Sequence, residues 1–250
     1  NKCVSAFKKY LYMKFDGYCL PGMYAEEAMD HFVGKHGQRL RLPNLVDDVS
    51  YQHAISKRKD TYELRLKYGI PAKKRVFFCP ARLLKLKGLD LFLKSAGKVK
   101  GISKACFLLA GEGPMKKELQ DIADKENLDV HFMGYCNQDT VIEFYALSDF
   151  FFLPSLQDCN PLSAIEAAFA GLPLCVSIYT GNSPELIQPY KNGVVFDILD
   201  TEEVQACIYF LLNASEEWVS NAGRESLAIA QNSFACINET KKFLAQLREG

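Results

Sequence analysis

Two carboxylates, Asp158 and Glu166, stand eight residues apart in a stretch that passes from a buried strand into a helix. A carboxylate accepts hydrogen bonds from hydroxyl groups, so each side chain can hold a sugar or a ribose ring. Glu166 falls on the helix face turned toward the sheet, where an ionised side chain is costly unless it has a partner. The spacing alone favours a simpler reading, a solvated loop acid and a locally paired helix acid, because two acids eight residues apart are common.

The helix in this stretch has a recognisable start. Asn160 is suited to be its N-cap and Pro161 its first helical residue. The N–H groups of Leu162 and Ser163 then point out of the helix N-terminus, which is a site suited to an anion. We therefore expect residues 160–163 to meet an anionic group.

A loop rich in cations follows an earlier buried strand, at residues 80–88. Arg82 and Lys87 could neutralise a diphosphate, and Gly88 would let the backbone approach it closely. By itself such a loop is most often only solvated, so this signal is weak.

A tight turn, Gly-Glu-Gly-Pro, follows the next apolar run at residues 111–114. Its two glycines either permit a ligand to approach closely or satisfy the geometry of the turn itself. The turn is not the dinucleotide-binding fingerprint, which needs further glycines at fixed offsets.

Short apolar runs that do not alternate with polar residues recur along the chain, and helical patterns lie between them. Such runs are buried on both faces, as in a parallel sheet. The alternation predicts an open, doubly wound, Rossmann-like α/β domain that binds its ligand at the carboxyl ends of the strands. The expected strands are residues 75–79, 106–110, 130–133, 149–153, 173–177 and 194–196. The expected buried helix faces comprise Leu89, Phe92, Leu93 and Ala96, then Leu119, Ile122 and Ala123, then Val141, Phe144 and Tyr145.

Other segments flank this domain. Residues 15–20 predict a strand and residues 24–33 a helix that ends at Gly34, and these cannot bury a core of their own. Residues 42–44 resemble a linker into a helix at residues 62–68. After the sheet, helices are expected at residues 203–213, 216–231 and 234–247.

The composition excludes several classes of protein. Thirty basic and thirty acidic residues cancel in the 250-residue chain, which argues against a general nucleic-acid binder. Nine scattered cysteines form no C-x-x-C pair, so a structural zinc site is not expected. The odd count without a signal peptide favours a reducing compartment, and no apolar run approaches the length of a membrane span.

Together, in this order and at these spacings, the signals are specific. The chain resembles the donor-binding half of the retaining, GT-B-fold glycosyltransferases, a large family that includes sucrose synthases and many bacterial polysaccharide and lipid glycosyltransferases. The resemblance covers roughly residues 42–197. It rests on R-x-x-x-x-K-G at residues 82–88, G-E-G-P at residues 111–114, Pro-Ser at residues 154–155 followed by Asp158 and Glu166, Ala-Gly-Leu-Pro at residues 170–173, Gly-Asn-Ser-Pro-Glu at residues 181–185 and Asn-Gly-Val at residues 192–194.

The resemblance implies a role for each matching residue. Arg82 and Lys87 would hold the diphosphate of a nucleotide sugar, and Asp158 would contact the hydroxyls of the transferred sugar as the third catalytic residue. Glu166 would bind the ribose, the backbone at residues 160–163 would meet sugar and phosphate, and residues 134–136 would border the base. The implied donor-binding residues are Gly88, Glu112, Gly134, Tyr135, Cys136, Asn160, Pro161, Leu162, Ser163 and Glu166.

Three positions differ from the family pattern. The first acid is Asp158 where glutamate is usual, Cys159-Asn160-Pro161 replaces Gly-Phe-Gly, and Asn182 replaces the second glycine of a Gly-Gly pair. We expect these differences to bear on the identity of the sugar more than on the fold.

The resemblance also implies an activity, a donor and a domain plan. It implies a retaining hexosyltransferase that moves a sugar from a nucleotide-diphosphate sugar to a glycan or lipid-linked acceptor in polysaccharide biosynthesis. No D-x-D sequence is present, which suits metal-independent chemistry without a cofactor. A cytoplasmic location is expected, with peripheral membrane association through a missing N-terminal domain. Residues 1–44 would be the remnant of that acceptor domain, residues 45–233 the donor-binding domain, and residues 234–250 a helix that packs back toward the N-terminal domain.

Alternatives come from other classes. The first is a non-catalytic nucleotide-sugar-binding module that acts with a partner chain. A nucleotide-sugar epimerase fits the paired-acid helix less well, and a dehydrogenase is disfavoured because no Gly-rich turn follows the first strand.

Overall fold

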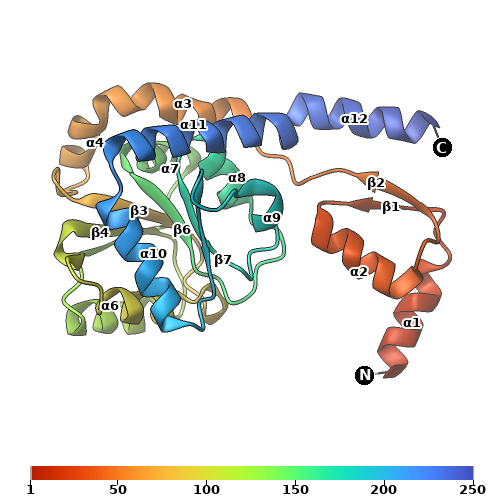
Figure 1. The fold of residues 1–250 in the computed structure, drawn as a ribbon, viewed down its shortest axis with the longest axis horizontal. Helices are drawn as coiled ribbons and strands as arrows, with labels where there is room; N and C mark the ends of the chain where they lie inside the picture. The colour runs from red at the N-terminus through yellow and green to blue at the C-terminus, as the bar shows by residue number, and fades with distance from the viewer. Residues whose placement is uncertain (1, 250) are drawn as a thin grey trace.

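The computed structural model describes residues 2–249 and has a large and a small lobe, joined by an extended segment (Figure 1). The large lobe is built on one six-stranded sheet in which every neighbouring pair of strands is parallel. The strands are β3 (Arg75–Pro80), β4 (Ala105–Ala110), β5 (Val130–Gly134), β6 (Phe150–Leu153), β7 (Leu174–Ser177) and β8 (Gly193–Phe196). All six apolar runs predicted as strands are therefore confirmed.

The order of the strands in the sheet is β5-β4-β3-β6-β7-β8. The chain moves outward in one direction from β3 and then returns to place β6 on the other side of β3. In an open parallel sheet, the loops that leave these two central strands diverge and form a crevice at their carboxyl ends. The loops in question are those that follow Pro80 and Leu153, which carry the predicted cations and the first predicted acid.

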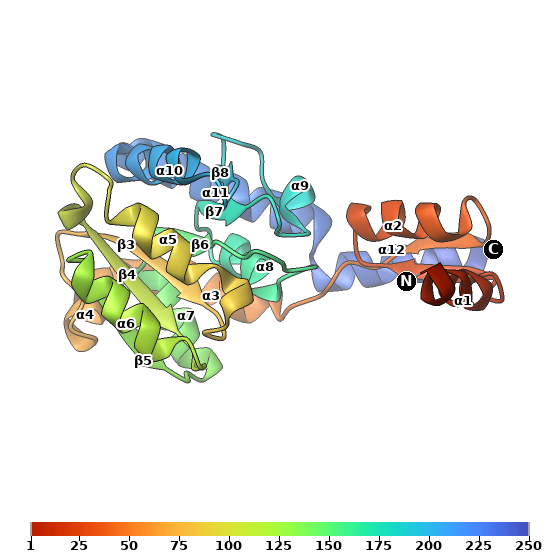
Figure 2. The ribbon, with the colours of Figure 1, turned by 90° about the horizontal axis from the view of Figure 1, so that it is seen from below.

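Helices cover both faces of the sheet, as the predicted doubly wound domain requires (Figures 1 and 2). One layer contains α5 (Leu89–Ala96), α6 (Lys116–Lys125) and α10 (Thr201–Asn213). The other contains α3 (Asp48–Lys57), α4 (Thr61–Lys67), α7 (Gln138–Leu147), α8 (Leu162–Phe169) and α11 (Glu216–Ser233). Short helical turns complete the lobe, namely α9 (Ser183–Leu186), η1 (Arg58–Asp60), η2 (Lys85–Lys87) and η3 (Ile102–Lys104).

The core of the large lobe is aromatic. Phe77 of β3 lies between Phe107 and Phe150, with ring centroids 5.4 and 4.9 Å away, and Phe92 of α5 stacks on Phe152 at 4.8 Å. All five side chains are fully buried, and burying one aromatic or large aliphatic side chain contributes about 1.5–3 kcal/mol. The predicted helix faces of α5, α6 and α7 are buried or partly buried against this sheet, so the positions of these helices are confirmed.

The small lobe has no comparable core. It contains α1 (Lys2–Tyr12), β1 (Gly17–Leu20), α2 (Met23–Val33) and β2 (Gln38–Arg41), of which α1 and β2 were not predicted. Tyr18, Leu20 and Val33 form a small buried cluster. Large apolar side chains of the same lobe are exposed, including Val4, Phe7, Tyr10, Leu11, Met13 and Phe15.

The helix α12 (Cys236–Glu249) runs out of the large lobe and lies beside β2 (Figure 1). Gln246 accepts a hydrogen bond from the N–H of Arg41 at 3.0 Å, and its carbonyl accepts one from Gln38 at 3.2 Å. The side chains of Ile237 and Leu244 on this helix are exposed. Among the residues from 2 to 249, no helix combines the length and apolar character needed to cross a bilayer.

Candidate functional site

The loops after β3 and β6 bring a predicted cation and a predicted acid together. The Nζ atom of Lys87 lies 2.5 Å from the Oδ2 atom of Asp158, and both side chains remain partly exposed to solvent. The structure therefore joins two residues that lie 71 positions apart in the sequence. A paired ammonium and carboxylate can each exchange partners when a charged, hydroxylated ligand enters.

Gly88 explains how the two loops come so close. Its backbone is left-handed, with φ 63°, and a Cβ atom there would lie 2.1 Å from the carbonyl oxygen of Pro154. The N–H of Leu156 also donates to the carbonyl of Leu86 at 2.8 Å. The close approach allowed by this glycine is to the neighbouring loop of the protein.

Arg82 and the glycine turn occupy the outer part of the same edge. The side chain of Arg82 is exposed and has no ion-pair or hydrogen-bond partner among residues 2–249. A Cβ at Gly111 would lie 2.1 Å from the carbonyl oxygen of Ala81, and one at Gly113 would lie 2.3 Å from that of Leu83. Of the two readings of this turn, the structure supports packing within the protein, since both glycines face the backbone of the cation loop.

Glu166 lies in a hollow of about 520 Å³ beside α8. The hydroxyl of Tyr145 donates to its Oε2 atom at 3.0 Å, and the hydroxyl of Tyr51 also donates to the carboxylate. Burial raises the pKa of Glu166, and the two tyrosine hydrogen bonds offset part of that rise. The hollow is lined by Leu45, Val46, Asp47, Tyr51, Pro80, Cys136, Gln138, Val141, Leu162, Ser163 and Glu166.

The predicted start of the helix at Asn160 needs correction. The helix α8 begins at Leu162, and Pro161 is its N-cap with an extended backbone (φ −67°, ψ 124°). Asn160 does not cap it because its side chain is bonded to Asn182 instead. Since no side chain caps α8, the N–H groups of Leu162 and Ser163 remain available to a ligand.

The loop after β5 contributes unevenly to the hollow. Cys136 lines it, whereas Tyr135 is 87% exposed and is not among the lining residues. Gly134 is left-handed, with φ 69°, and a Cβ there would lie 2.9 Å from the Oε1 atom of Glu112. The carboxylate of Glu112 also pairs with Lys116 at 3.2 Å. Glu112 and Gly134 thus lie together at the rim of the sheet.

A second hollow, the cleft between the lobes, adjoins Asp158. Its volume is about 480 Å³, and its walls are mainly apolar. It is bounded by α2 of the small lobe and by the loops after β6 and β7 of the large lobe. The lining residues are Pro21, Tyr24, Ala25, Ala28, Leu156, Gln157, Asp158, Cys159, Asn160, Ile178, Tyr179 and Gly181.

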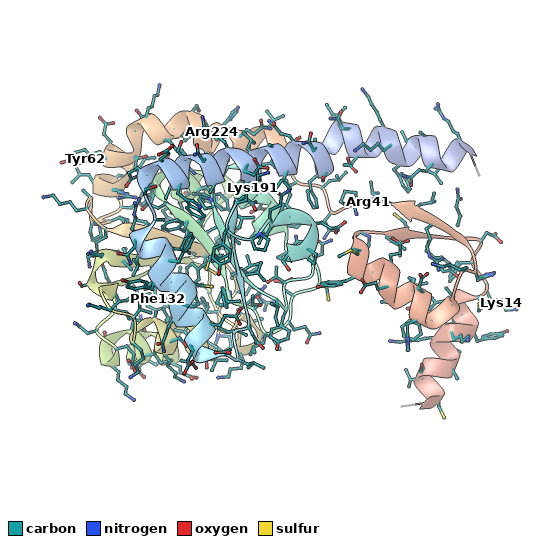
Figure 3. The ribbon with its side chains drawn as sticks, in the orientation of Figure 1. Lys14, Arg41, Tyr62, Phe132, Lys191 and Arg224 are labelled. Atoms are coloured by element: carbon teal, nitrogen blue, oxygen red, sulfur yellow. The ribbon has the colours of Figure 1, made fainter. Side chains whose placement is uncertain are left out.

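The small lobe is attached at this cleft by polar contacts. Arg41, labelled in Figure 3, forms an ion pair with Glu185 of α9, and the same carboxylate accepts a hydrogen bond from the N–H of Met23 at 3.3 Å. The side chain of Asn44 donates to the carbonyl of Asn160 at 3.1 Å. The lobes thus meet beside the predicted site.

Neither α3 nor the contact of two tyrosines with Glu166 was predicted from the sequence. The helix α3 has few apolar residues in register, but Asp47 caps it by accepting from the N–H of Ser50, and that capping pair was a usable signal. Tyr145 was predicted as a buried residue, and only the folded chain shows that its hydroxyl reaches Glu166.

A separate group of metal-ligand residue types, Cys106, Asp129 and His131, lies at the amino ends of β4 and β5. The two carboxylate oxygens of Asp129 already face Lys74 at 2.9 Å and His131 at 3.0 Å. This cluster is at the opposite end of the sheet from Lys87 and Asp158.

Comparison with known proteins gives a family and a fold for the chain. The profile described as glycosyl transferases group 1 matches residues 60–225 of the chain. The sulfoquinovosyl transferase of Arabidopsis thaliana is 31% identical over 193 residues, which cover 75% of this chain and 36% of that protein. An alpha-monoglucosyldiacylglycerol synthase of Streptococcus pneumoniae is 25% identical over 76% of this chain and 42% of its own length. The chain thus spans less than half the length of these two relatives.

Solved structures show the same fold. A sucrose-phosphate synthase from Thermosynechococcus elongatus superposes on the whole chain with a TM-score of 0.83 at 18% identity, covering 62% of that enzyme. The Anabaena protein HepE was solved in complex with UDP and glucose. Its superposition covers 98% of this chain and 66% of the HepE chain, with a TM-score of 0.78 at 17% identity. The predicted GT-B-type, Rossmann-like fold is confirmed.

Proposed function

The chain belongs to the glycosyl transferases group 1 family, and from that premise we propose that it is the donor-binding part of an enzyme that transfers a hexose from a nucleotide-diphosphate sugar to a glycan or lipid-linked acceptor. The observation that carries the proposal is the contact between Lys87 and Asp158 at the crevice between β3 and β6. Ligands bind in this crevice in open parallel sheets.

The proposed donor spans both hollows. The hollow around Glu166 takes the nucleoside, with the carboxylate accepting the ribose hydroxyls in place of the tyrosine hydroxyls. The free N–H groups at the start of α8 and the side chains of Lys87 and Arg82 then meet the diphosphate. The sugar reaches the cleft beside Asp158, where its hydroxyls hydrogen bond to the carboxylate.

Charge development explains how this arrangement accelerates transfer. The bond between the anomeric carbon and the diphosphate oxygen breaks, and the bonding electrons leave with the nucleoside diphosphate. The acceptor hydroxyl forms the new bond to that carbon, and its proton passes to an oxygen of the departing diphosphate. Lys87, Arg82 and the N–H groups of α8 stabilise the negative charge on the leaving group, and one such preorganised donor is worth roughly 3 kcal/mol of barrier.

Retention of anomeric configuration, independence from metal and a reducing cytoplasmic location complete the proposal. The relatives support the transfer of a sugar, because one is a sulfoquinovosyl transferase and another an alpha-monoglucosyldiacylglycerol synthase. This chain spans only part of the length of both relatives. The acceptor and the complete transfer reaction are therefore part of the proposal as well.

A thermal-shift panel of UDP-, GDP- and ADP-sugars tests the donor site. We expect one base to raise the melting temperature of the chain and the other two to raise it less. If no nucleotide sugar binds at millimolar concentration, the proposed donor site is wrong.

A labelled donor separates the transferase from a non-catalytic binding module. Transfer to a glycan or lipid acceptor, or slow hydrolysis of the donor, indicates catalysis by the chain. Tight binding without either reaction in the full-length protein would instead support the binding module.

A further inference from the structure

Two asparagines that depart from the family pattern are bonded to each other. The Nδ2 atom of Asn182 donates to the Oδ1 atom of Asn160 at 3.0 Å and to the carbonyl oxygen of Pro161 at 3.0 Å. The Asn182 side chain is almost completely buried, at 1% exposure. One amide group thus holds both the N-cap of α8, Pro161, and the residue before it, Asn160.

The segment that contains Asn182, residues 179–182, also holds the earlier part of the loop after β6, residues 154–160, which we call the acid loop. The N–H of Asp158 donates to the carbonyl of Tyr179 at 3.1 Å, and the N–H of Gly181 donates to the carbonyl of Asp158 at 2.7 Å. A Cβ at Gly181 would lie 1.8 Å from the carbonyl oxygen of Cys159, so only glycine permits this approach. Residues 179–182 therefore hold the loop at successive positions, first through backbone bonds and then through the Asn182 amide.

Asn160 extends these contacts to the small lobe. Its carbonyl oxygen accepts a hydrogen bond from Asn44 at 3.1 Å, and its Nδ2 atom lies 3.5 Å from the carbonyl of Pro21. Displacing Asn160 would therefore disturb the acid loop, the start of α8 and the lobe contact together.

The Asn182 side chain lowers the stability of the fold, so its presence needs another explanation. The Oδ1 atom of Asn182 is buried without a hydrogen-bond partner in the described part of the chain. A buried polar atom without a partner destabilises a fold, and glycine at this position would avoid that cost. A positioning role accounts for the amide better than a contribution to stability does.

We propose that Asn160 and Asn182 act as one positioning unit that aims the first turn of α8 at the diphosphate and sugar of the donor. The inference rests on the proposed function. The N–H groups of Leu162 and Ser163 follow directly after the bonded carbonyl of Pro161, so their direction depends on the pair. The ribose hollow is held separately, because Glu166 is bonded to Tyr145 and Tyr51.

A double-mutant cycle tests the unit. Calorimetry measures the affinities of the preferred nucleoside monophosphate, nucleoside diphosphate and nucleotide sugar for the wild type, Asn160→Ala, Asn182→Ala and the double variant. We expect each single variant to lose about tenfold affinity for the diphosphate and the nucleotide sugar, with less than twofold change for the monophosphate. The double variant should lose no more than the larger single loss, because two members of one unit are not additive.

Asn192→Ala is the matched control. Asn192 is also a fully buried asparagine, whose amide donates to the carbonyl of Leu186 at 3.0 Å and to Ser226 at 3.2 Å, away from the acid loop. This variant should lower the melting temperature while leaving the ratio of diphosphate to monophosphate affinity unchanged.

The outcomes distinguish a failure of the positioning unit from a failure of the proposed donor site. An unchanged affinity ratio in both single variants, or losses that add in the double variant, overturns the positioning unit while the donor site stands. Absence of nucleotide binding by the wild type rejects the proposed function instead. Because Asn160 is partly exposed, its variant gives a second reading if Asn182→Ala fails to fold.

Discussion

The hollow around Glu166 is lined by α8, and the cleft around Asp158 is lined by the loop that leads into this helix, but the two carboxylates have different partners. Glu166 is bonded to the hydroxyls of Tyr145 and Tyr51, and burial raises its pKa. Asp158 is opposed by the ammonium group of Lys87 at 2.5 Å. The Glu166 carboxylate, which accepts from neutral hydroxyls, can accept ligand hydroxyls in their place. The Lys87 ammonium group, which is paired with a carboxylate, can bind a phosphate instead. The division suits a ligand with a neutral end and a charged middle.

The largest effect should follow from removing the cation that pairs with Asp158. In the proposed site, Lys87→Ala removes the charge that would face the diphosphate and leaves Asp158 unpaired beside it, so both changes oppose binding. We expect the affinity for the nucleoside diphosphate to fall about 100-fold in calorimetry.

Lys85→Ala is the control for this prediction. Lys85 lies in the same loop but pairs with the buried Asp90 at 2.6 Å. Its loss should lower stability and leave the affinity within twofold. Equal losses of affinity in both variants would show that the loop acts only by its net charge.

A smaller but still large effect is expected in the hollow. Glu166→Ala removes the proposed acceptor of the ribose hydroxyls, and we expect more than tenfold weaker binding of both the nucleoside mono- and diphosphate. Glu143→Ala is the matched control, because Glu143 also accepts a tyrosine hydroxyl, that of Tyr68 at 2.5 Å, on the outer side of α7. If Glu166→Ala binds both nucleotides with unchanged affinity, the assignment of the nucleoside to this hollow is wrong.

The comparison also predicts a pH dependence of stability at Glu166. Because burial raises its pKa, the folded protein binds this proton more tightly than the unfolded chain does. Its contribution is most favourable below the ordinary glutamate pKa and is lost as the pH rises through the raised pKa. Relative to the wild type, Glu166→Gln should therefore gain free energy of unfolding from pH 4 to pH 7 in urea denaturation. A constant difference across this range would contradict the assignment.

The smallest expected effect concerns metal. If Lys87, Arg82 and the N–H groups of α8 stabilise the diphosphate, then removing divalent cations with EDTA should change the affinity of the nucleotide sugar by less than twofold. Added magnesium serves as the reverse measurement. If EDTA lowers the affinity tenfold, then a divalent cation stabilises part of the charge on the diphosphate.

The parts of the fold that were predictable share a physical origin. A parallel strand buried on both faces must be a continuous apolar run, as β4 and β6 are, and a helix on the sheet must carry one apolar face, as α5 does. The weakly patterned α3 and β2 lacked such a signal, because much of their surface remains outside the core.

The candidate site was predictable to the level of residue types and strand ends. The meeting of Lys87 with Asp158 followed from the carboxyl ends of two central strands lying side by side. The bond between Asn160 and Asn182 could not be predicted from the sequence, because it joins loops whose separation is set by the approach of Gly181 to Cys159. For the same reason, only the folded chain shows that Gly88 and Gly111 face protein backbone.

The ion pair between Lys87 and Asp158 bears on how fast a donor arrives. Of the cations in the loop after β3, Lys85 and Lys87 are already neutralised by Asp90 and Asp158, so the mouth of the crevice carries little net attraction. Arg82, exposed and without a partner in the described chain, is left to supply the long-range pull on an anionic donor. One unpaired charge in water is screened within about 8 Å at physiological ionic strength. Association rates should therefore depend only weakly on salt, and differences in affinity among donors should arise mainly from their dissociation rates.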